Sequence, residues 1–272
     1  MSDATDRPFV VVPCLNEEQA IGDLLVGVLA HCADVIVIDD GSTDRTADIA
    51  AALPVTLIRH QTRRGKGEAL RAGFRKALEL GASGVLTMDG DGQHDPADIP
   101  RILAAARRFP GALVIGARML GRECQPNARR RANAFADWGI SWGCGRPVAD
   151  TQSGQRWYPH AAVELVDLPA QDFVFEAAIL IAASRDLDMP VASIPIACRY
   201  DSGARHSHFR PVRDVLRITL YTIGQIAHYG SAVQSYRASH DSPPEVYDPD
   251  HRLEAPTAAP LRRVGSPPPA RG

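Results

Sequence analysis

Short apolar runs alternate with longer amphipathic stretches through the first 116 residues. The runs are rich in valine, isoleucine and leucine, and they predict strands at Phe9–Pro13, Val35–Asp40, Val55–Arg59, Gly84–Asp89 and Ala112–Gly116. Helix-length patterns lie between them, an alternation that is typical of βαβ units and a mostly parallel sheet. The pattern therefore predicts an α/β fold in which several strands end in acidic residues.

The alternation is looser beyond Gly116. The elements predicted there are helices near Arg129–Cys144, Phe173–Arg185 and Pro211–Tyr229, and strands at Arg156–Tyr158 and Val191–Arg199. Residues 1–8 are polar and are expected to be flexible. Residues 238–272 are rich in proline, serine, alanine and arginine without periodicity, which predicts a disordered tail. A single folded domain at residues 9–230 remains.

Two helix starts carry capping signals. Asn16 is predicted to cap a helix with Gln19 at its third position, and Asp95 to cap one that begins at Pro96.

The last predicted helix, Pro211–Tyr229, has a broad apolar stripe flanked by arginine and histidine. It could lie in a lipid headgroup layer, or pack on the core as a final helix, which we favour. Core packing is also favoured for Trp138 and Trp142, which lie four positions apart.

Composition indicates an ordinary globular chain. Its 272 residues are 45% hydrophobic, enough for a substantial core, and 30 Lys+Arg against 32 Asp+Glu give no indication of nucleic-acid binding. The five cysteines never have a CxxC spacing, so neither a zinc site nor a disulfide framework is predicted, and a reducing, cytoplasmic location is expected. Neither a signal peptide nor a membrane-spanning run is recognisable.

The strongest chemical signal is the segment Met88–Asp95, MDGDGQHD, which follows an apolar strand. Open α/β sheets bind ligands at the carboxyl ends of their strands. Asp89 and Asp91 can present oxygens to one hard cation, and Gln93 or His94 could add a ligand. Mg²⁺ or Mn²⁺ bridging two phosphates is the natural occupant. The alternative is an acidic surface turn.

Three further segments carry candidate binding residues. Asp39 and Asp40 end the second predicted strand, where a carboxylate can accept hydrogen bonds from a ribose or a base, although the same residues suit a turn. The basic stretch Arg63–Gly73 opens a helix and suits phosphate, or forms a solvated face. Val10–Gln19 ends the first strand with a proline and opens the next helix with acidic residues.

The order of these signals resembles glycosyltransferase family 2, and within it the dolichol- or polyprenyl-phosphate sugar transferases, from about Phe9 to about Phe209. The motifs that carry the resemblance are P-x-x-N-E (Pro13, Asn16, Glu17), D-D-G-S-T-D (Asp39 to Asp44), G-K-G-x-A-L (Gly65 to Leu70), M-D-G-D-G-Q-H (Met88 to His94), G-A-R (Gly116 to Arg118), D-T-Q-S-G (Asp150 to Gly154) and R-H-S-H-F (Arg205 to Phe209).

The resemblance implies a single-domain GT-A fold with a Rossmann-like sheet, inversion of the anomeric centre, a nucleotide-binding half at residues 9–116 and an acceptor-binding half at residues 117–230. It implies the following site residues: Pro13, Leu15, Glu17, Ile38 and Asp40 around base and ribose; Asp89, Gly90, Asp91 and Gln93 around diphosphate and metal; and Lys66, Arg118, and Arg205 or Arg199, near the phosphates. The implied donor is a GDP- or UDP-sugar, and the implied acceptor a lipid phosphate or other lipid at the cytoplasmic face of a membrane.

The acceptor decides whether a general base is needed. A lipid phosphate is already anionic and can attack unaided, whereas a hydroxyl needs a carboxylate near its proton. Asp150 is the candidate base for a hydroxyl, with backbone capping as the alternative. Leu15 stands where many relatives carry an aromatic residue, and His208 where they often carry lysine, so neither the base nor the acceptor is assigned.

Other functional classes fit less well. A sugar-nucleotidyltransferase would be expected to open with a glycine-rich loop carrying arginine and lysine, and this chain has VVVPCLNEE there. A non-catalytic nucleotide-binding relative would be expected to lose a metal carboxylate, yet Asp89 and Asp91 are both present. A dinucleotide dehydrogenase would carry G-x-G-x-x-G after the first strand.

Overall fold

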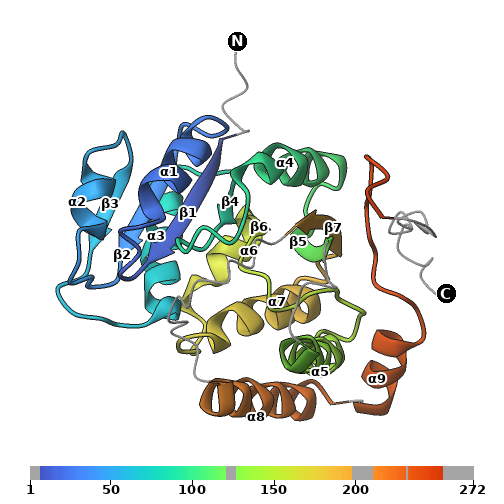
Figure 1. Cartoon of the computed structure of the whole chain (residues 1–272). Helices are drawn as coiled ribbons and strands as arrows, with labels where there is room; N and C mark the ends of the chain where they lie inside the picture. Colours follow the sequence, from blue (N-terminus) through green and yellow to red (C-terminus); the bar gives the residue numbers. More distant parts are fainter. Residues whose placement is uncertain (1–6, 121–126, 198–210, 231, 254–272) are drawn as a thin grey trace.

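The computed structural model describes residues 7–120, 127–197, 211–230 and 232–253. Within these ranges the strands form one seven-stranded sheet in the order β3-β2-β1-β4-β6-β5-β7 (Figure 1). The strands are β1 (Pro8–Cys14), β2 (Val35–Asp39), β3 (Thr56–Arg59), β4 (Gly84–Thr87), β5 (Leu113–Leu120), β6 (Arg156–Pro159) and β7 (Val191–Ala197). The predicted α/β fold is confirmed.

Helices cover both faces of this sheet. Their bounds are α1 (Ile21–Leu29), α2 (Thr46–Ala51), α3 (Lys66–Glu79), η1 (Pro96–Asp98), α4 (Ile99–Arg108), α5 (Asn127–Cys144), α6 (His160–Val163), η3 (Glu164–Asp167), α7 (Val174–Asp186), α8 (Pro211–Tyr229) and α9 (Ala232–His240).

The sheet is mostly parallel, as predicted. β1 pairs in parallel with β2 and β4, β2 with β3, and β5 with β7, whereas β6 runs antiparallel between β4 and β5. The carboxyl ends of β1, β2, β4 and β5 therefore meet at one edge of the sheet. Loops that follow these strands are the ones that can share a binding site.

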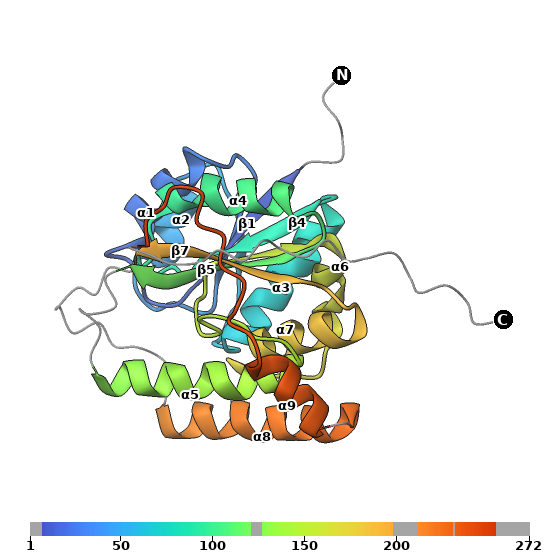
Figure 2. The same ribbon diagram turned by 90° about the vertical axis from the view of Figure 1, so that its right-hand side faces the viewer.

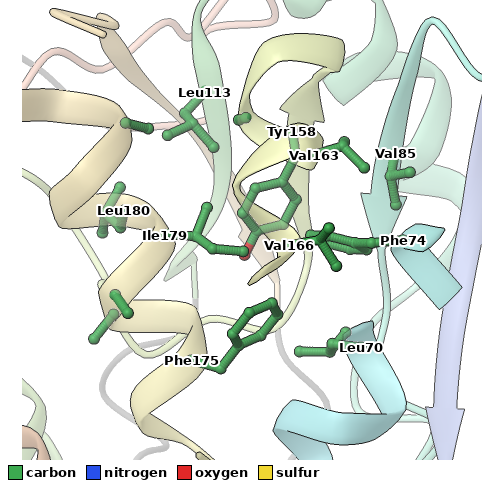
Figure 3. Close-up of a cluster of buried hydrophobic side chains, with 14 of the residues drawn as sticks. Leu70, Phe74, Val85, Leu113, Tyr158, Val163, Val166, Phe175, Ile179 and Leu180 are labelled. Carbon is green, nitrogen blue, oxygen red and sulfur yellow. The ribbon is translucent and has the colours of Figure 1, made fainter. Parts of the chain in front are cut away.

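Alternation along β1 divides the core in two. Val10 and Val12 face α1 and α4, whereas Phe9 and Val11 face α3 and α7. Figure 3 shows the second core, in which Phe74 packs edge-on against Tyr158 with ring centroids 5.2 Å apart. Because both faces of β1 are covered, the strand is apolar throughout.

An outer helical layer lies beyond the second core. α7 is buried on nearly all sides, and α5, α8 and α9 lie outside it, below the sheet in the view of Figure 2. A helix that is apolar all round must be enclosed in this way. Among the described residues no helix combines the length and the apolar composition needed to cross a bilayer.

The capping prediction for Asp95 is confirmed, and that for Asn16 is wrong. Asp95 Oδ1 accepts a hydrogen bond from the backbone N–H of Ala97. Helix α1 starts only at Ile21, and its N-cap residue makes no side-chain cap. Asn16 instead has a φ of 56°, and its Oδ1 accepts from the N–H of Thr43 at 2.9 Å. Its side chain joins two loops rather than starting a helix.

The predicted disordered tail begins too early. Residues 232–240 form α9, and Val246 forms a parallel bridge with Ser193 on the edge strand β7. Tyr247 packs edge-on against Phe109, and Asp250 pairs with Arg101 at 2.6 Å. Residues 238–253 are therefore packed on the domain, through contacts that the hydrophobic periodicity of the sequence does not indicate. Residues 254–272 lie outside the described ranges.

Core packing, favoured for the two tryptophans of α5, is wrong for Trp138. Its side chain is 41% exposed and stacks on Phe135 with ring centroids 5.8 Å apart. Trp142 is partly buried, and its Nε1 donates to the carbonyl of Ala232 at the start of α9. The periodicity located both residues on one helix face, but that face is covered only in part.

Candidate active site

Predicted site residues from three elements meet at the carboxyl edge of the sheet. Asp89 follows β4, Arg118 lies on β5, and Lys66 opens α3. Lys66 Nζ lies 2.8 Å from Asp89 Oδ1. Arg118 is close enough to contribute to lowering the pKa of Asp89. The structure therefore unites residues that the sequence separates by about fifty positions.

Lys66 is held between two carboxylates. Besides Asp89, its Nζ contacts Glu176 Oε2 on α7 at 3.1 Å. Burial acts to lower the pKa of Lys66, but the two adjacent carboxylates outweigh burial and raise it. Burial likewise acts to raise the pKa of Asp89, but Lys66, together with His94 and Arg118, outweighs burial and lowers it. The site thus contains a charged ammonium that is fixed between the carboxyl groups of Asp89 and Glu176.

The glycines beside Lys66 serve packing rather than a phosphate loop. A Cβ on Gly65, whose φ is 97°, would collide with the carboxylate of Asp172. A Cβ on Gly67 would lie 2.8 Å from the backbone nitrogen of Asp172 and 3.2 Å from Phe175. Only glycines let the start of α3 approach the start of α7 this closely. That approach is what brings Lys66 to Glu176.

The basic stretch that contains Lys66 is partly structural. Arg71 is buried, and its guanidinium donates to the carbonyls of Val166, Leu168 and Ala170. The expectation that this whole stretch would meet an anion is therefore wrong for Arg71, because its donors bind these backbone carbonyls and the carboxylate of Glu68. The sequence could not distinguish this arginine from an exposed one.

Two further glycines permit close packing around Asp89. A Cβ on Gly154 would collide with Asp89 Oδ2, and one on Gly90 would lie 2.8 Å from Cys14 Cβ. The backbone just before β6 is held by Thr87, whose Oγ1 donates to the Gly154 carbonyl at 2.8 Å. The D-T-Q-S-G and D-G-D motifs are therefore in direct contact.

Asp91 and Gln93 occupy the turn after β4 and are partly buried. Asp91 Oδ1 accepts from the N–H of Gln93 at 3.0 Å, which orients the carboxylate. His94, the alternative ligand, is buried, and burial lowers its pKa to about 4, so its ring is neutral at pH 7.

The side chains around Asp89 and Asp91 can be compared with the ligands that divalent cations require. No group of three histidine, cysteine, aspartate or glutamate side chains suited to a metal occurs in the part of the chain that the structure describes. A complete protein cage for zinc is thus not seen there. Mg²⁺ and Mn²⁺ are commonly held by one or two carboxylates together with substrate phosphates, which the oriented Asp91 fits.

Asp150 is tied to Arg118. Asp150 Oδ2 accepts from the backbone N–H and Nε of Arg118, at 2.7 and 2.8 Å, and Oδ1 accepts from a terminal guanidinium nitrogen at 2.6 Å. Burial acts to raise the pKa of Asp150, but these bonds outweigh it and lower the pKa. A buried carboxylate with both oxygens engaged and a low pKa is poorly suited to take a proton, which disfavours its role as a base.

Asp40 is also engaged within the protein. Its oxygens accept from the backbone N–H groups of Arg64 and Gly65, at 2.9 and 2.8 Å, and contact His60 Nδ1 at 2.8 Å. The neighbouring Asp39 accepts from the N–H of Ser42. The turn interpretation of this acidic pair therefore describes the structure better than a direct contact with ribose.

The remaining predicted site residues differ in their exposure to solvent. Ile38 is fully buried in the core with α3, and Pro13 is buried at the end of β1. Leu15 and Glu17 remain partly exposed beyond β1. An Ile38 contact with a nucleotide is thus contradicted by its position, whereas Leu15 and Glu17 keep accessible side-chain surface. Arg199 and Arg205 lie outside the described residues.

Sequence reasoning missed Glu176 and Asp172. Neither belongs to a motif, but Glu176 interrupts the apolar stretch FVFEAAILIAA. A carboxylate within a buried apolar run needs a partner inside the protein. The position of Glu176 in this run was therefore the signal from which its role could have been predicted.

Comparisons with known proteins agree with this geometry. The family model described as Glycosyl transferase family 2 matches residues 9–162. The undecaprenyl-phosphate mannosyltransferase of Micrococcus luteus is 31% identical over 212 residues, which cover 70% of this chain and 82% of the relative. The UDP-N-acetylglucosamine–dolichyl-phosphate N-acetylglucosaminyltransferase of Methanococcus voltae is 27% identical over 216 residues, which cover 71% of this chain and 85% of the relative.

A solved structure has the same fold. Glucosyl-3-phosphoglycerate synthase from Mycobacterium tuberculosis superposes with a TM-score of 0.58 at 24% identity, covering 84% of this chain and 80% of that protein. That protein was crystallised with Mn²⁺, UDP and phosphoglyceric acid. At this identity the likeness concerns the fold, and the expected GT-A fold is confirmed.

Proposed function

The chain belongs to glycosyl transferase family 2, and we propose that it transfers a sugar from a UDP- or GDP-sugar to a lipid-linked phosphate acceptor. The reaction inverts the anomeric centre and uses Mg²⁺ or Mn²⁺. The observation that carries the proposal is the convergence of Asp89, Asp91, Lys66 and Arg118 at the carboxyl edge of the sheet. A diphosphate needs such a combination of metal carboxylates and cations.

Asp91 is the principal metal ligand in this proposal, with Asp89 and Gln93 beside it. Asp89 is the weaker candidate because Lys66 already contacts one of its oxygens at 2.8 Å. The cation supplies positive charge that stabilises the departing nucleoside diphosphate. The turn contributes orientation, because the Gln93 N–H holds the Asp91 carboxylate before the donor arrives.

Arg118 and Asp150 act as a unit. Asp150 accepts two hydrogen bonds from the guanidinium and a third from the backbone N–H of Arg118, so that Arg118 keeps its orientation without the donor. A preorganised cation stabilises the charge that develops on phosphate without a further ordering cost. Asp150 is therefore a positioning residue, and we do not assign it the role of general base.

The proposed acceptor is a lipid-linked phosphate. Two relatives, from Micrococcus luteus and Methanococcus voltae, are named for transfer to undecaprenyl phosphate and dolichyl phosphate. A phosphate acceptor is already anionic and attacks without a base. This chemistry is consistent with the engagement of Asp150. The enzyme would then work as a peripheral protein on the cytoplasmic face of a membrane.

The two halves of the chain have different roles in this proposal. Residues 9–116 would bind the donor, with Leu15 and Glu17 nearest the base, and residues 117–230 would bind the acceptor. The ion pairs of Lys66 join these halves, since Asp89 belongs to the first and Glu176 to the second. Both halves are then held at a fixed distance around the reacting centre.

Donor binding can be tested by thermal shift. The full chain is heated with UDP, GDP, dTDP or CDP, each with Mn²⁺ or with EDTA. A ligand that binds only the folded state raises the melting temperature. Metal-dependent stabilisation by one nucleotide supports the donor site and identifies the base, whereas no shift with any nucleotide contradicts it.

Transfer itself is measured with a radiolabelled nucleotide sugar and a short-chain polyprenyl phosphate in detergent. Label in the organic phase, dependent on Mn²⁺ or Mg²⁺, is the expected result. Transfer to phosphoglyceric acid or another soluble acceptor instead would contradict the lipid acceptor while leaving the donor site intact. The two assays therefore separate the donor proposal from the acceptor proposal.

A further inference from the structure

Large exposed apolar side chains gather on one layer of the molecule. Of the nine such side chains in the described ranges, seven lie on α5, α8 and α9, and only Val26 and Leu187 lie elsewhere. The seven are Phe135, Trp138, Leu216, Leu220, Ile223, Val233 and Tyr236, and their surface is called the basal face below. Single exposed apolar residues are normal, but such a concentration marks an interaction surface.

Helix α8 has a buried side and, opposite to it, an exposed side that carries large apolar residues. The side that packs on the domain carries buried residues four positions apart, namely Asp214, Ile218, Thr222 and Ile226. The outward side carries Leu216, Leu220 and Ile223, which are 55%, 60% and 57% exposed. A helix that merely covered the core would present polar residues outward. The outward row of α8 is left uncovered by the described part of the domain.

The charges on the same helices have one sign. Arg131, Arg213 and Arg237 are exposed on α5, α8 and α9 in turn. Among the described side chains of these three helices no carboxylate is exposed, because Asp214 is buried and Asp137 is partly buried against Thr151. Helices that expose large apolar side chains together with arginines complement an anionic lipid headgroup layer.

We propose that the basal face binds the surface of an anionic phospholipid bilayer, with the outward row of α8 in the headgroup layer. A second copy of the chain fits less well, because a twofold interface would set the exposed arginines of these three helices against their own copies. Like charges brought together in this way would oppose the apolar contact. An anionic bilayer satisfies both features of the face.

The basal face is connected to the active site through α8. Arg217 Nη1 lies 2.9 Å from Asp172 Oδ2, and Asp172 lies against Gly65, next to Lys66. The inference builds on the proposed function, since a lipid-linked phosphate must be presented from a membrane. A bilayer under α8 would therefore lie on the acceptor-binding half of the enzyme.

Vesicle sedimentation tests the face without any substrate. The full chain is mixed with vesicles of phosphatidylglycerol and phosphatidylcholine, or of phosphatidylcholine alone, and bound protein is measured. We expect binding only to the anionic vesicles. Ile223→Glu should weaken it about tenfold, and Arg213→Gln about fivefold. Val26→Glu is the matched control, because Val26 is a β-branched residue 59% exposed on α1.

Three results would overturn the inference. They are no binding to anionic vesicles, equal binding by Ile223→Glu and Val26→Glu, or a dimer in solution that Ile223→Glu but not Val26→Glu dissociates. The last result would assign the face to a second copy. Circular dichroism and nucleotide thermal shift verify that each variant is folded. Because these vesicles contain neither sugar donor nor polyprenyl phosphate, the outcome is independent of whether sugar transfer is detected.

Discussion

At the sheet edge charged side chains are buried, whereas on the basal face large apolar side chains are exposed. Asp150 is 3% exposed and Arg118 8%, while Leu220 is 60% exposed and Val233 67%. Folding alone favours neither arrangement, because burial of charge carries a desolvation cost and exposed apolar area adds no stability. Most of the domain buries apolar side chains and exposes charged ones, and both regions depart from this pattern. Such departures are expected at functional surfaces.

The difference lies in where the partners are. At the sheet edge Lys66 has its counter-charges Asp89 and Glu176 within the protein, and Arg118 has Asp150. The apolar row of α8 has no such cover among the residues that the structure describes. Changes at the sheet edge should therefore alter folding or chemistry, whereas changes on the basal face should leave both nearly intact.

The largest effect is expected from Asp150→Asn. The substitution leaves the Arg118 guanidinium buried without its counter-charge, which should cost about 3–5 kcal/mol of folding free energy, measured by urea denaturation. The matched control is Asp167→Asn, which breaks an ion pair to Arg75 whose side chains are 77% and 54% exposed. That change should cost less than about 1 kcal/mol. Equal losses in both variants would contradict a structural role for the buried pair.

Asp91→Asn should remove sugar transfer while sparing the fold. Loss of one ionised metal ligand should lower turnover about 10²–10³-fold, the range seen when one electrostatic stabiliser of a transition state is removed. The melting temperature should stay near that of the parent, because the Asp91 side chain is only partly buried in a turn. Asp48→Asn on the exposed side of α2 is the control. Parental turnover by Asp91→Asn would refute the metal assignment.

Glu176→Gln should lower turnover by about tenfold, the scale of an outer ligand that orients a catalytic group. The amide removes one of the two charges that hold Lys66 beside Asp89. A double-mutant cycle with Lys66→Met measures the coupling. If Glu176 acts through Lys66, the double variant is no slower than Lys66→Met alone. Fully additive losses would show that the two residues act independently.

Acid should weaken the sheet edge before the basal face is affected. Buried Asp150 has a pKa lowered by Arg118 relative to the unfolded chain. A carboxylate with a depressed folded pKa stabilises the protein above its unfolded pKa of about 3.9, and this stability is lost as pH falls further. Denaturation between pH 7 and 3 should show a smaller acid-dependent loss in Asp150→Asn than in the parent. Identical slopes would contradict this contribution.

The smallest effect is expected on the basal face. Leu216→Ser should change the free energy of unfolding by no more than about 0.5 kcal/mol, because the side chain is 55% exposed and faces away from the buried row of α8. Ile218→Ser on the opposite side is the contrast, and it should be strongly destabilising. A large loss in Leu216→Ser would mean that the domain itself uses the outward row.

The sequence determined the order of strands and helices and the placement of the acidic motifs. Apolar period and turn chemistry are local properties, so the strands before Asp39 and Asp89 and the cap at Asp95 could be predicted within a residue or two. The rule that parallel strands present their carboxyl ends at one edge then located the candidate site. The resemblance to glycosyltransferase family 2 added the roles of particular residues.

Only the tertiary structure decided which side chains pair and which face solvent. The cap predicted at Asn16 is replaced by a bond to Thr43, and Asp150 is committed to Arg118, because partners distant in sequence offer better hydrogen bonds than local ones. Glu176 reaches Lys66 because Gly65 and Gly67 admit α7. The exposure of Trp138 and Leu220 depends on what covers each helix. A helical period identifies the faces of a helix, but the packing of the other elements decides which face remains open.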